Sequence, residues 1–216
     1  MIYLETFSVP TADTLFLLIL SILTLESAHS IWFLYQHFLS GITEKSLNVF
    51  YYACSYAKVD YSRFMNTTVR IALKLVPDSL QTQPVFLCVD DTMVSKFGTK
   101  FENASKLFDH AAHNGSNYLN GHCFVSVMLC IPVWNRDKVF YLSVPLGYRM
   151  WQKKESKLEL AASMIRQVMP EFHSKDHVII LCDSWYIKQN LVSIVDEYPN
   201  LDLIGNARID SVMYDL

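Results

Sequence analysis

The sequence predicts an α/β fold in which a mixed sheet with flanking helices follows an all-helical N-terminal unit. Three observations lead to this fold class: helical spacing of apolar residues over 1–80, a polar joint bounded by proline, and alternating β-like and helical segments over 85–216. Of the 216 residues, 51% are apolar and 18% are charged. A chain of this composition can build a sizeable core, which excludes a disordered protein.

Apolar residues in the N-terminal unit recur at intervals of three and four, the spacing of an amphipathic helix, as in Leu15, Leu18, Ile19 and Ile22. Thr11 or Asp13 is the expected cap of the first helix, and Ser40-Gly41 is the expected break after a second one. A helix-turn-helix would be one way to bind DNA here. Five basic against six acidic residues in this unit disfavour it.

Two features indicate a cytoplasmic protein without a membrane partner. The apolar run 15–25 is about half the ~20 residues that a membrane-spanning helix needs, and Asp13 and Glu26 close it off. We therefore expect a buried helix there. The five cysteines are an odd number and three of them lie inside apolar runs, which fits buried, reduced thiols.

The second part of the chain begins after a polar, proline-bounded joint at 77–84, the expected linker. Residues 85–89 are predicted to form a buried strand that ends at Asp90-Asp91, and a long polar loop over 92–120 follows. The remaining elements are a β-hairpin over 122–133 and 138–148, a helix over 155–172, a strand over 177–181, a helix over 187–197 and a strand over 201–204. This order predicts a mixed sheet with helices packed on it.

Asp90, Asp91 and Asp183 follow two of the predicted strands. The carboxyl ends of strands in an open α/β sheet gather at one edge, so these acids are expected side by side. Clustered carboxylates repel one another unless a cation is present, and they could hold Mg²⁺ or Mn²⁺ ions that activate a water or a 3′-hydroxyl for attack on a phosphodiester. The alternative is that each acid caps the next turn or helix.

Charge is unevenly distributed in a chain whose net charge is −3. Residues 92–157 carry nine basic and four acidic residues, whereas 158–216 carry four basic and nine acidic ones. The basic stretch permits DNA binding, although solvated charge runs are also common. Its candidate phosphate contacts are Lys96, Lys100, Lys153 and Lys154.

Other polar and aromatic residues have two interpretations each. Trp185 and Tyr186 follow Asp183, where they would either stack on an unpaired base or pack against the sheet. A second group contains residue types that bind zinc. Its spacing matches no common zinc finger, so a polar loop is the preferred interpretation. This group consists of Asp109, His110, His113, His122 and Cys123.

Four segments of the second part carry recognisable motifs: FLCVDDT at 86–92, YLNGH at 118–122, VPLGYR at 144–149 and LCDSWY at 181–186. Together they resemble blocks of DDE-type insertion-sequence transposases of the insertion-sequence-four group. The likeness extends over 85–216 and is weaker in the helical N-terminal unit.

This resemblance implies an RNase H-like catalytic domain with the first aspartate on the first strand and the second on the fourth. Asp91 matches the first, with Asp90 as its substitute, and Asp183 matches the second. Arg208 looks like an arginine that approaches the DNA after the fifth strand. The third carboxylate of the family is a Glu on a later helix, and no matching segment occurs before Leu216. We therefore expect an incomplete catalytic domain and little or no activity from this chain alone.

The resemblance implies metal-dependent DNA transposition, with transposon ends and target DNA as partners and a homodimer as the active assembly. The alternative is a non-catalytic, DNA- or partner-binding remnant of a decayed transposase. A phosphatase of the haloacid dehalogenase type is set aside, because it needs two aspartates separated by one residue and Asp90-Asp91-Thr92 departs from that pattern.

Overall fold

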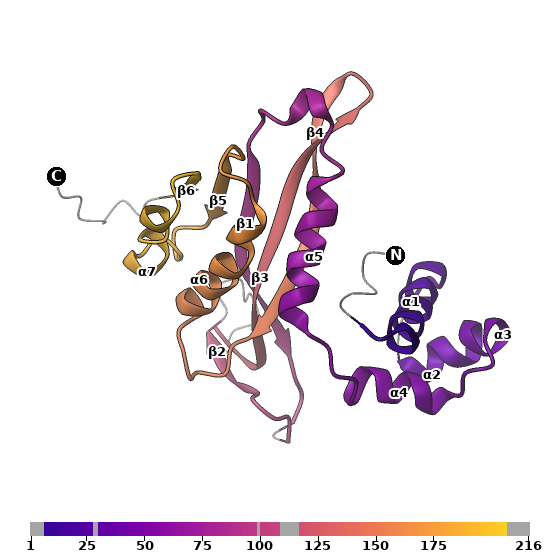
Figure 1. The fold of residues 1–216 in the computed structure, drawn as a ribbon. Helices are drawn as coiled ribbons and strands as arrows, with labels where there is room; N and C mark the ends of the chain where they lie inside the picture. Colours follow the sequence, from indigo (N-terminus) through magenta and orange to yellow (C-terminus); the bar gives the residue numbers. More distant parts are fainter. Residues whose placement is uncertain (1–6, 28–29, 99, 109–116, 207–216) are drawn as a thin grey trace. The chain divides into compact units, whose positions relative to one another are not determined.

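The computed structural model describes residues 7–27, 30–98, 100–108 and 117–206 (Figure 1). The chain packs as two compact units, Met1–Thr67 and Thr68–Leu216. The division falls inside helix α5 (Tyr61–Leu73), earlier in the chain than the proline-bounded joint at 77–84. The second half of α5 therefore groups with the sheet.

The described part of the first unit is all helical, as the sequence predicts. Its elements are α1 (Val9–Thr24), α2 (Ile31–Leu34), a π-helical turn (Tyr35–Leu39), α3 (Ser40–Ile42), α4 (Leu47–Ser55) and the start of α5. The structure differs from the expectations at two points. Helix α1 starts at Val9 with Pro10 in its first turn, where proline's fixed φ favours helix initiation. Ser40 and Gly41 continue the second helical stretch instead of breaking it.

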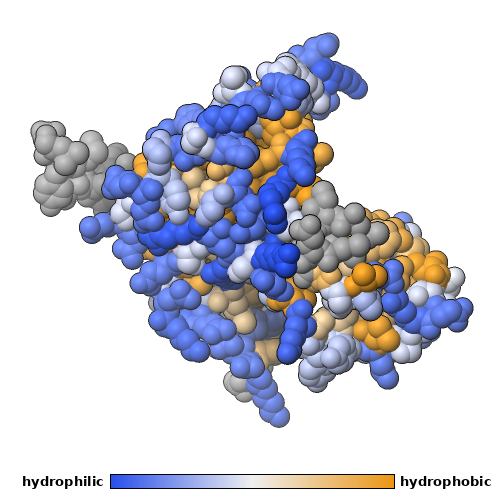
Figure 2. Space-filling model, in the orientation of Figure 1, coloured by the Kyte–Doolittle hydropathy of each residue, from blue (hydrophilic) through white to orange (hydrophobic). Residues whose placement is uncertain are grey.

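A small apolar core holds the first unit together. One buried cluster contains Leu18 of α1, Leu34 of α2, Leu39 of the π-helical turn and Phe50 of α4. Leu39 and Phe50 are fully enclosed. The opposite side of α1 stays in solvent, and apolar surface is visible on this unit in Figure 2. The large exposed apolar residues of α1 are Val9, Phe16, Ile19, Ile22 and Leu23.

The run 15–25 lies mostly within α1, which has 16 residues. Across residues 7–27, 30–98, 100–108 and 117–206, no helix combines the length and apolar character needed to cross a bilayer.

The second unit is built on a six-stranded mixed sheet. Its strands are β1 (Val85–Ser95), β2 (Ser105–Phe108), β3 (Tyr118–Asn135), β4 (Lys138–Met150), β5 (Val178–Cys182) and β6 (Leu201–Gly205). β1 lies between an antiparallel β3 and a parallel β5, and β6 runs parallel beyond β5. β2 and β4 both pair with β3 in an antiparallel sense. The predicted mixed α/β sheet is confirmed, and its strand arrangement is compatible with an RNase H-like fold.

β1 is longer than the sequence predicts, and this changes the setting of two candidate residues. The strand continues to Ser95, so Asp90 and Asp91 lie within it rather than at its end. The extension persists because Asp90 to Ser95 pair with β3, even though the pairing with β5 stops at Val89. The predicted loop is shortened further by β2, which pairs with the start of β3.

Helix α6 (Lys157–Val168) covers one face of this sheet and packs against β3 (Figure 1). It begins with a complete capping box: the Ser156 hydroxyl accepts from the Glu159 amide, and the Glu159 carboxylate accepts from the Ser156 amide. The Arg149 guanidinium of β4 also donates to α6, at 2.8 Å to Ser163 Oγ and 2.6 Å to Gln167 Oε1. The Arg149 contacts therefore tie the second half of α6 to β4.

Four short elements complete the unit. They are 3₁₀ turns at Asp78–Leu80, Met169–Glu171 and Val195–Glu197, and the four-residue helix α7 (Gln189–Val192). The helix expected over 187–197 is thus reduced to α7 and one 3₁₀ turn.

Candidate active site

Two adjacent parallel strands bring the candidate acids to one edge of the sheet. The β1–β5 pairing ends with Val89 opposite Cys182, so Asp90 is the next residue on β1 and Asp183 directly follows β5. Asp183 has the predicted position directly after the end of a strand. On β1, the two aspartates lie just beyond Val89, the last residue that pairs with β5.

The pleat of β1 separates Asp90 from Asp91. Successive strand residues point to opposite faces, and Val85, Leu87 and Val89 are buried on the face that α6 covers. Asp91 belongs to that face, with 18% of its side chain exposed. Asp90 is exposed on the other face, where its Oδ1 accepts from the Asp91 amide at 2.8 Å. Asp91 is therefore the acid of β1 that faces α6.

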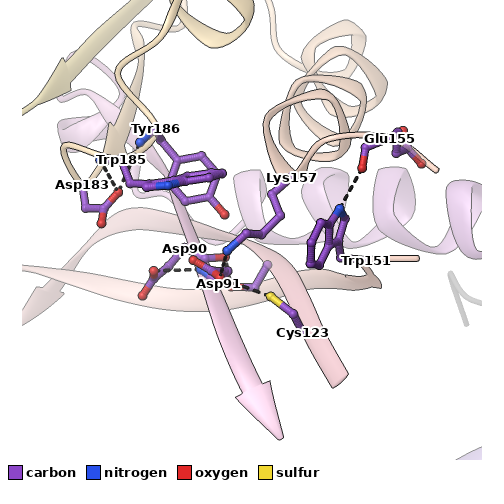
Figure 3. Close-up of polar contacts among 10 residues, drawn as sticks. Asp90, Asp91, Cys123, Trp151, Glu155, Lys157, Asp183, Trp185 and Tyr186 are labelled. Carbon is purple, nitrogen blue, oxygen red and sulfur yellow. Dashed lines mark hydrogen bonds and ion pairs between the residues drawn. The ribbon is translucent and has the colours of Figure 1, made fainter. Parts of the chain in front are cut away.

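The Asp91 carboxylate is held by two donors from other elements (Figure 3). The Lys157 ammonium, on the first residue of α6, lies 2.5 Å from Asp91 Oδ2. The Cys123 thiol of β3 donates to the same oxygen at 3.2 Å. Asp91 thus joins the first turn of the helix to two neighbouring strands.

Asp183 caps the turn that follows β5. Its Oδ1 accepts from the backbone amides of Trp185 at 3.0 Å and Tyr186 at 3.3 Å, and its carbonyl accepts from the Tyr186 amide at 3.1 Å. One carboxylate oxygen of Asp183 therefore acts as a cap, as the alternative interpretation predicts, but it caps a turn rather than a helix. This turn fixes the orientation of Asp183 at the edge of the sheet.

Lys157 is a residue of this site that sequence reasoning did not single out. Only 18% of its side chain is exposed, and its ammonium lies 4.6 Å from the ring centroid of Trp185 and 5.9 Å from that of Trp151. Aromatic faces attract a cation, and more strongly when it is partly removed from water. The available signal was a lysine directly after a helix cap, but nothing local in the sequence connects it with Asp91.

Tyr186 is fully buried, so its ring packs in the core and is not exposed for stacking on a base. Among the described residues its hydroxyl has no hydrogen-bond partner. Burial, followed by the negative charge of Asp91, raises the pKa of this hydroxyl above its ordinary value of 10.0. Trp185 is half-buried and also has the Lys188 ammonium 4.7 Å from its ring centroid.

Two thiols at this edge are kept protonated. Burial, with the hydrogen bond to Asp91 as the second cause, raises the pKa of Cys123 from 9.0 to about 12. Burial, followed by the charge of Asp183, raises the pKa of Cys182 to about 11. Neither thiol is a thiolate nucleophile near neutral pH, because the thiolate is the reactive form.

The donor chemistry at this edge fits a hard divalent cation, since Asp91 and Asp183 supply carboxylate oxygens. Within the described ranges, however, no three His, Cys, Asp or Glu residues are grouped closely enough to hold a metal ion. Lys157 also holds one of the Asp91 oxygens. The oxygen ligands therefore suit a divalent cation, but the Lys157 ammonium is already paired with Asp91.

The other predicted contacts have ordinary surface positions. Lys100, Lys153 and Lys154 are exposed, and Lys96 is half-buried with its ammonium 5.5 Å from the Phe101 ring centroid. Arg208 lies outside the described residues, as do Asp109, His110 and His113 of the zinc question. The remaining two members of that group have other partners: His122 Nε2 lies 2.8 Å from the Glu102 carbonyl oxygen, and Cys123 donates to Asp91.

A cavity of about 600 Å³ lies elsewhere on the second unit. Val85 and His177, at the opposite ends of β1 and β5 from the acids, are among its lining residues. Arg70 and Glu171 also line it and form an ion pair at 3.3 Å. Asp91 and Asp183 are not among the residues that line this cavity.

No known family model matches this sequence, and no curated protein matches it. Among solved structures, the chain is similar at 11% identity and a TM-score of 0.27 to one described as the crystal structure of the Mos1 strand transfer complex. The match covers 93% of this chain and 58% of that one, so the chain spans less than two thirds of the matched protein.

Proposed function

We propose that this protein is a DDE-type transposase that acts on DNA, with Asp91 and Asp183 as its metal-binding carboxylates. The observation that carries the proposal is the placement of these two acids on neighbouring parts of a mixed sheet: Asp91 lies on β1, and Asp183 directly follows its parallel neighbour β5. This is the position that the transposase resemblance implies for the first two acids of the site. Asp91 is preferred to Asp90 because it lies on the face covered by α6.

Asp91 and Asp183 would hold the Mg²⁺ or Mn²⁺ ion. When bound, such an ion activates a water or a 3′-hydroxyl and stabilises the leaving oxygen of a phosphodiester. The chain's own residues orient these ligands: the amides of Trp185 and Tyr186 fix Asp183, and the Cys123 thiol fixes Asp91. The protonated thiol serves as a donor here because its pKa is about 12.

DNA would be bound along the basic segment 92–157, which carries nine basic and four acidic residues. Phosphate contacts of this kind give affinity without sequence preference and weaken with salt. The proposed contacts are Lys96, Lys100, Lys153, Lys154 and Arg208, with Trp185 as an aromatic neighbour. We also propose a homodimer as the active assembly and a cytoplasmic location, where the five free thiols stay reduced.

The test is Mg²⁺-dependent nicking of duplex DNA that carries the ends of the element encoding this protein. Asp91→Asn and Asp183→Asn should each lower the rate by about 100-fold or more, because each removes a ligand charge. Asp90→Asn is the matched control, since it makes the same change on the other face of β1 and should retain most of the rate. Nicking that survives Asp183→Asn would contradict the proposed site.

A second candidate function is DNA or partner binding without catalysis, as expected of a transposase remnant. It is favoured by a specific observation: Lys157 pairs with Asp91, and no third acid joins Asp91 and Asp183 among the described residues. This candidate predicts salt-dependent duplex binding without nicking in either Mg²⁺ or Mn²⁺. Nicking above the level of Asp183→Asn would exclude it.

A further inference from the structure

Lys157 occupies an unfavourable place for a cation. It is the first residue of α6, and the unsatisfied amides at a helix N-terminus carry a partial positive charge that disfavours a lysine. Ser156 and Glu159 already complete the cap of this helix, so the Lys157 side chain adds nothing to it. Its placement is explained instead by the carboxylate that it reaches on β1.

The contact between Lys157 and Asp91 is sheltered from water. Each side chain is 18% exposed, and the ammonium lies between the rings of Trp185 and Trp151. A charge in such a place needs a partner, because an isolated ion loses much of its hydration there. The ammonium therefore supplies the positive charge that the Asp91 carboxylate requires while no other cation is bound.

We infer that Lys157 is the resident cation of this site, and that a divalent ion competes with its ammonium for the Asp91 carboxylate and displaces it. The inference rests on the proposed function, in which Asp91 is a metal ligand. A divalent ion needs lone pairs of the Asp91 carboxylate, and Oδ2 is engaged by both the Lys157 ammonium and the Cys123 thiol. Lys157 is thus a positioning residue that competes with the metal ion and holds Asp91 in place before the ion arrives.

Displacement has a consequence for the tethered ammonium. A lysine side chain has a flexible four-carbon stem, so the released ammonium stays near the edge of the sheet. It is then free to pair with a phosphate of the bound DNA, as a lysine in a phosphate site does. Lys157 would therefore neutralise Asp91 in the free protein and a DNA phosphate in the protein that has bound the divalent ion and DNA.

The experiment measures Mn²⁺ affinity of the full chain by isothermal titration calorimetry at pH 7.5. Lys157→Met keeps the apolar stem and removes the competing charge, so it should bind Mn²⁺ about tenfold more tightly than the unchanged protein, a difference of about 1.4 kcal/mol. Lys157→Arg keeps the charge and should bind no more tightly than the unchanged protein. Lys188→Met is the matched control: it removes a lysine near the same Trp185 ring but away from Asp91, and its affinity should stay within about twofold.

The outcomes separate this inference from the proposed function. Equal Mn²⁺ affinity in Lys157→Met and the unchanged protein would overturn the resident cation and leave the metal site standing. An equal gain in Mn²⁺ affinity for Lys188→Met would also overturn it, because the loss of any nearby positive charge would then explain the gain. Absence of Mn²⁺ binding in every variant would overturn both proposals.

A second measurement does not depend on how well Lys157→Met folds. In the unchanged protein with isotope-labelled lysine, the Lys157 side-chain resonance, assigned through Lys157→Arg, should shift as Mg²⁺ saturates the site. The Lys188 resonance serves as the internal control and should shift much less. A Lys157 resonance that stays in place while Mg²⁺ binds would overturn the inference.

Discussion

The Lys157 ammonium lies 2.5 Å from the Asp91 Oδ2 atom, and this ion pair joins the first turn of α6 to the middle of β1. The two residues are 66 positions apart in the chain. Both belong to the same compact unit, and both side chains are largely removed from solvent. The pair is therefore a tertiary contact that contributes to stability as well as to the candidate site.

This pair should show strong coupling in a double-mutant cycle. Asp91→Asn and Lys157→Met each leave a partly buried charge without its partner, so each should lower the free energy of unfolding by about 1–3 kcal/mol. The double variant should lose less than the sum of the two, with a coupling of about 0.5–3 kcal/mol. Urea unfolding followed by circular dichroism gives these values. Strictly additive losses would show that the ion pair does not stabilise the fold.

The cap of α6 should be worth more than a helix cap that lacks its side-chain bond. Ser156→Ala removes the hydroxyl that accepts from the Glu159 amide and should cost about 1 kcal/mol of stability. Ser46→Ala is the matched control, because Ser46 precedes α4 but its side chain makes no capping hydrogen bond. Thermal unfolding of both variants checks the difference. A larger loss for Ser46→Ala would contradict the assigned cap.

Gly121 is required where β1 and β3 approach each other. A Cβ added at this position would lie 2.2 Å from the Val94 carbonyl oxygen, which is backbone and cannot move aside cheaply. Gly121→Ala should therefore cost about 2 kcal/mol or more. Gly41→Ala is the control: it lies in a helix with open space around its Cβ, and it should stabilise by about 0.5–1 kcal/mol. Chemical denaturation measures both, and a neutral Gly121→Ala would refute the close approach.

The protonated Cys123 thiol should make stability depend on alkaline pH. A group whose pKa is 9.0 in the unfolded chain and about 12 when folded binds its proton more tightly in the fold. Its contribution is complete below pH 9 and is lost as the pH rises toward 12. Urea titrations at pH 8 to 11 should therefore show falling stability, and Cys123→Ala should flatten this decline. Cys54→Ala, at an exposed thiol, should change the slope less, and equal slopes in all three proteins would contradict the assignment.

The helical N-terminal unit and the succession of strands and helices after it, apart from β2, could be predicted because they depend on local apolar periodicity. The buried run Val178–Cys182 was predicted within one residue at each end, and the hairpin of β3 and β4 follows from two β-like runs separated by turn residues. The end of β1 could not be predicted in this way. Exposed and half-buried residues alternate in its outer half, and this half remains a strand because β3 supplies hydrogen-bond partners that no local pattern reveals.

The sequence by itself determined which residue types follow β5 and occupy β1, and so it determined the pair of candidate acids, Asp91 and Asp183. Only the tertiary structure decided that Asp91 faces α6 while Asp90 faces away, that Tyr186 is enclosed, and that Lys157 pairs with Asp91. The physical reason is that local apolar patterns predict most strands, whereas the partner of a buried charge depends on how segments far apart in the sequence pack together. A lysine at the start of a helix becomes part of the site only when that helix is laid across the sheet.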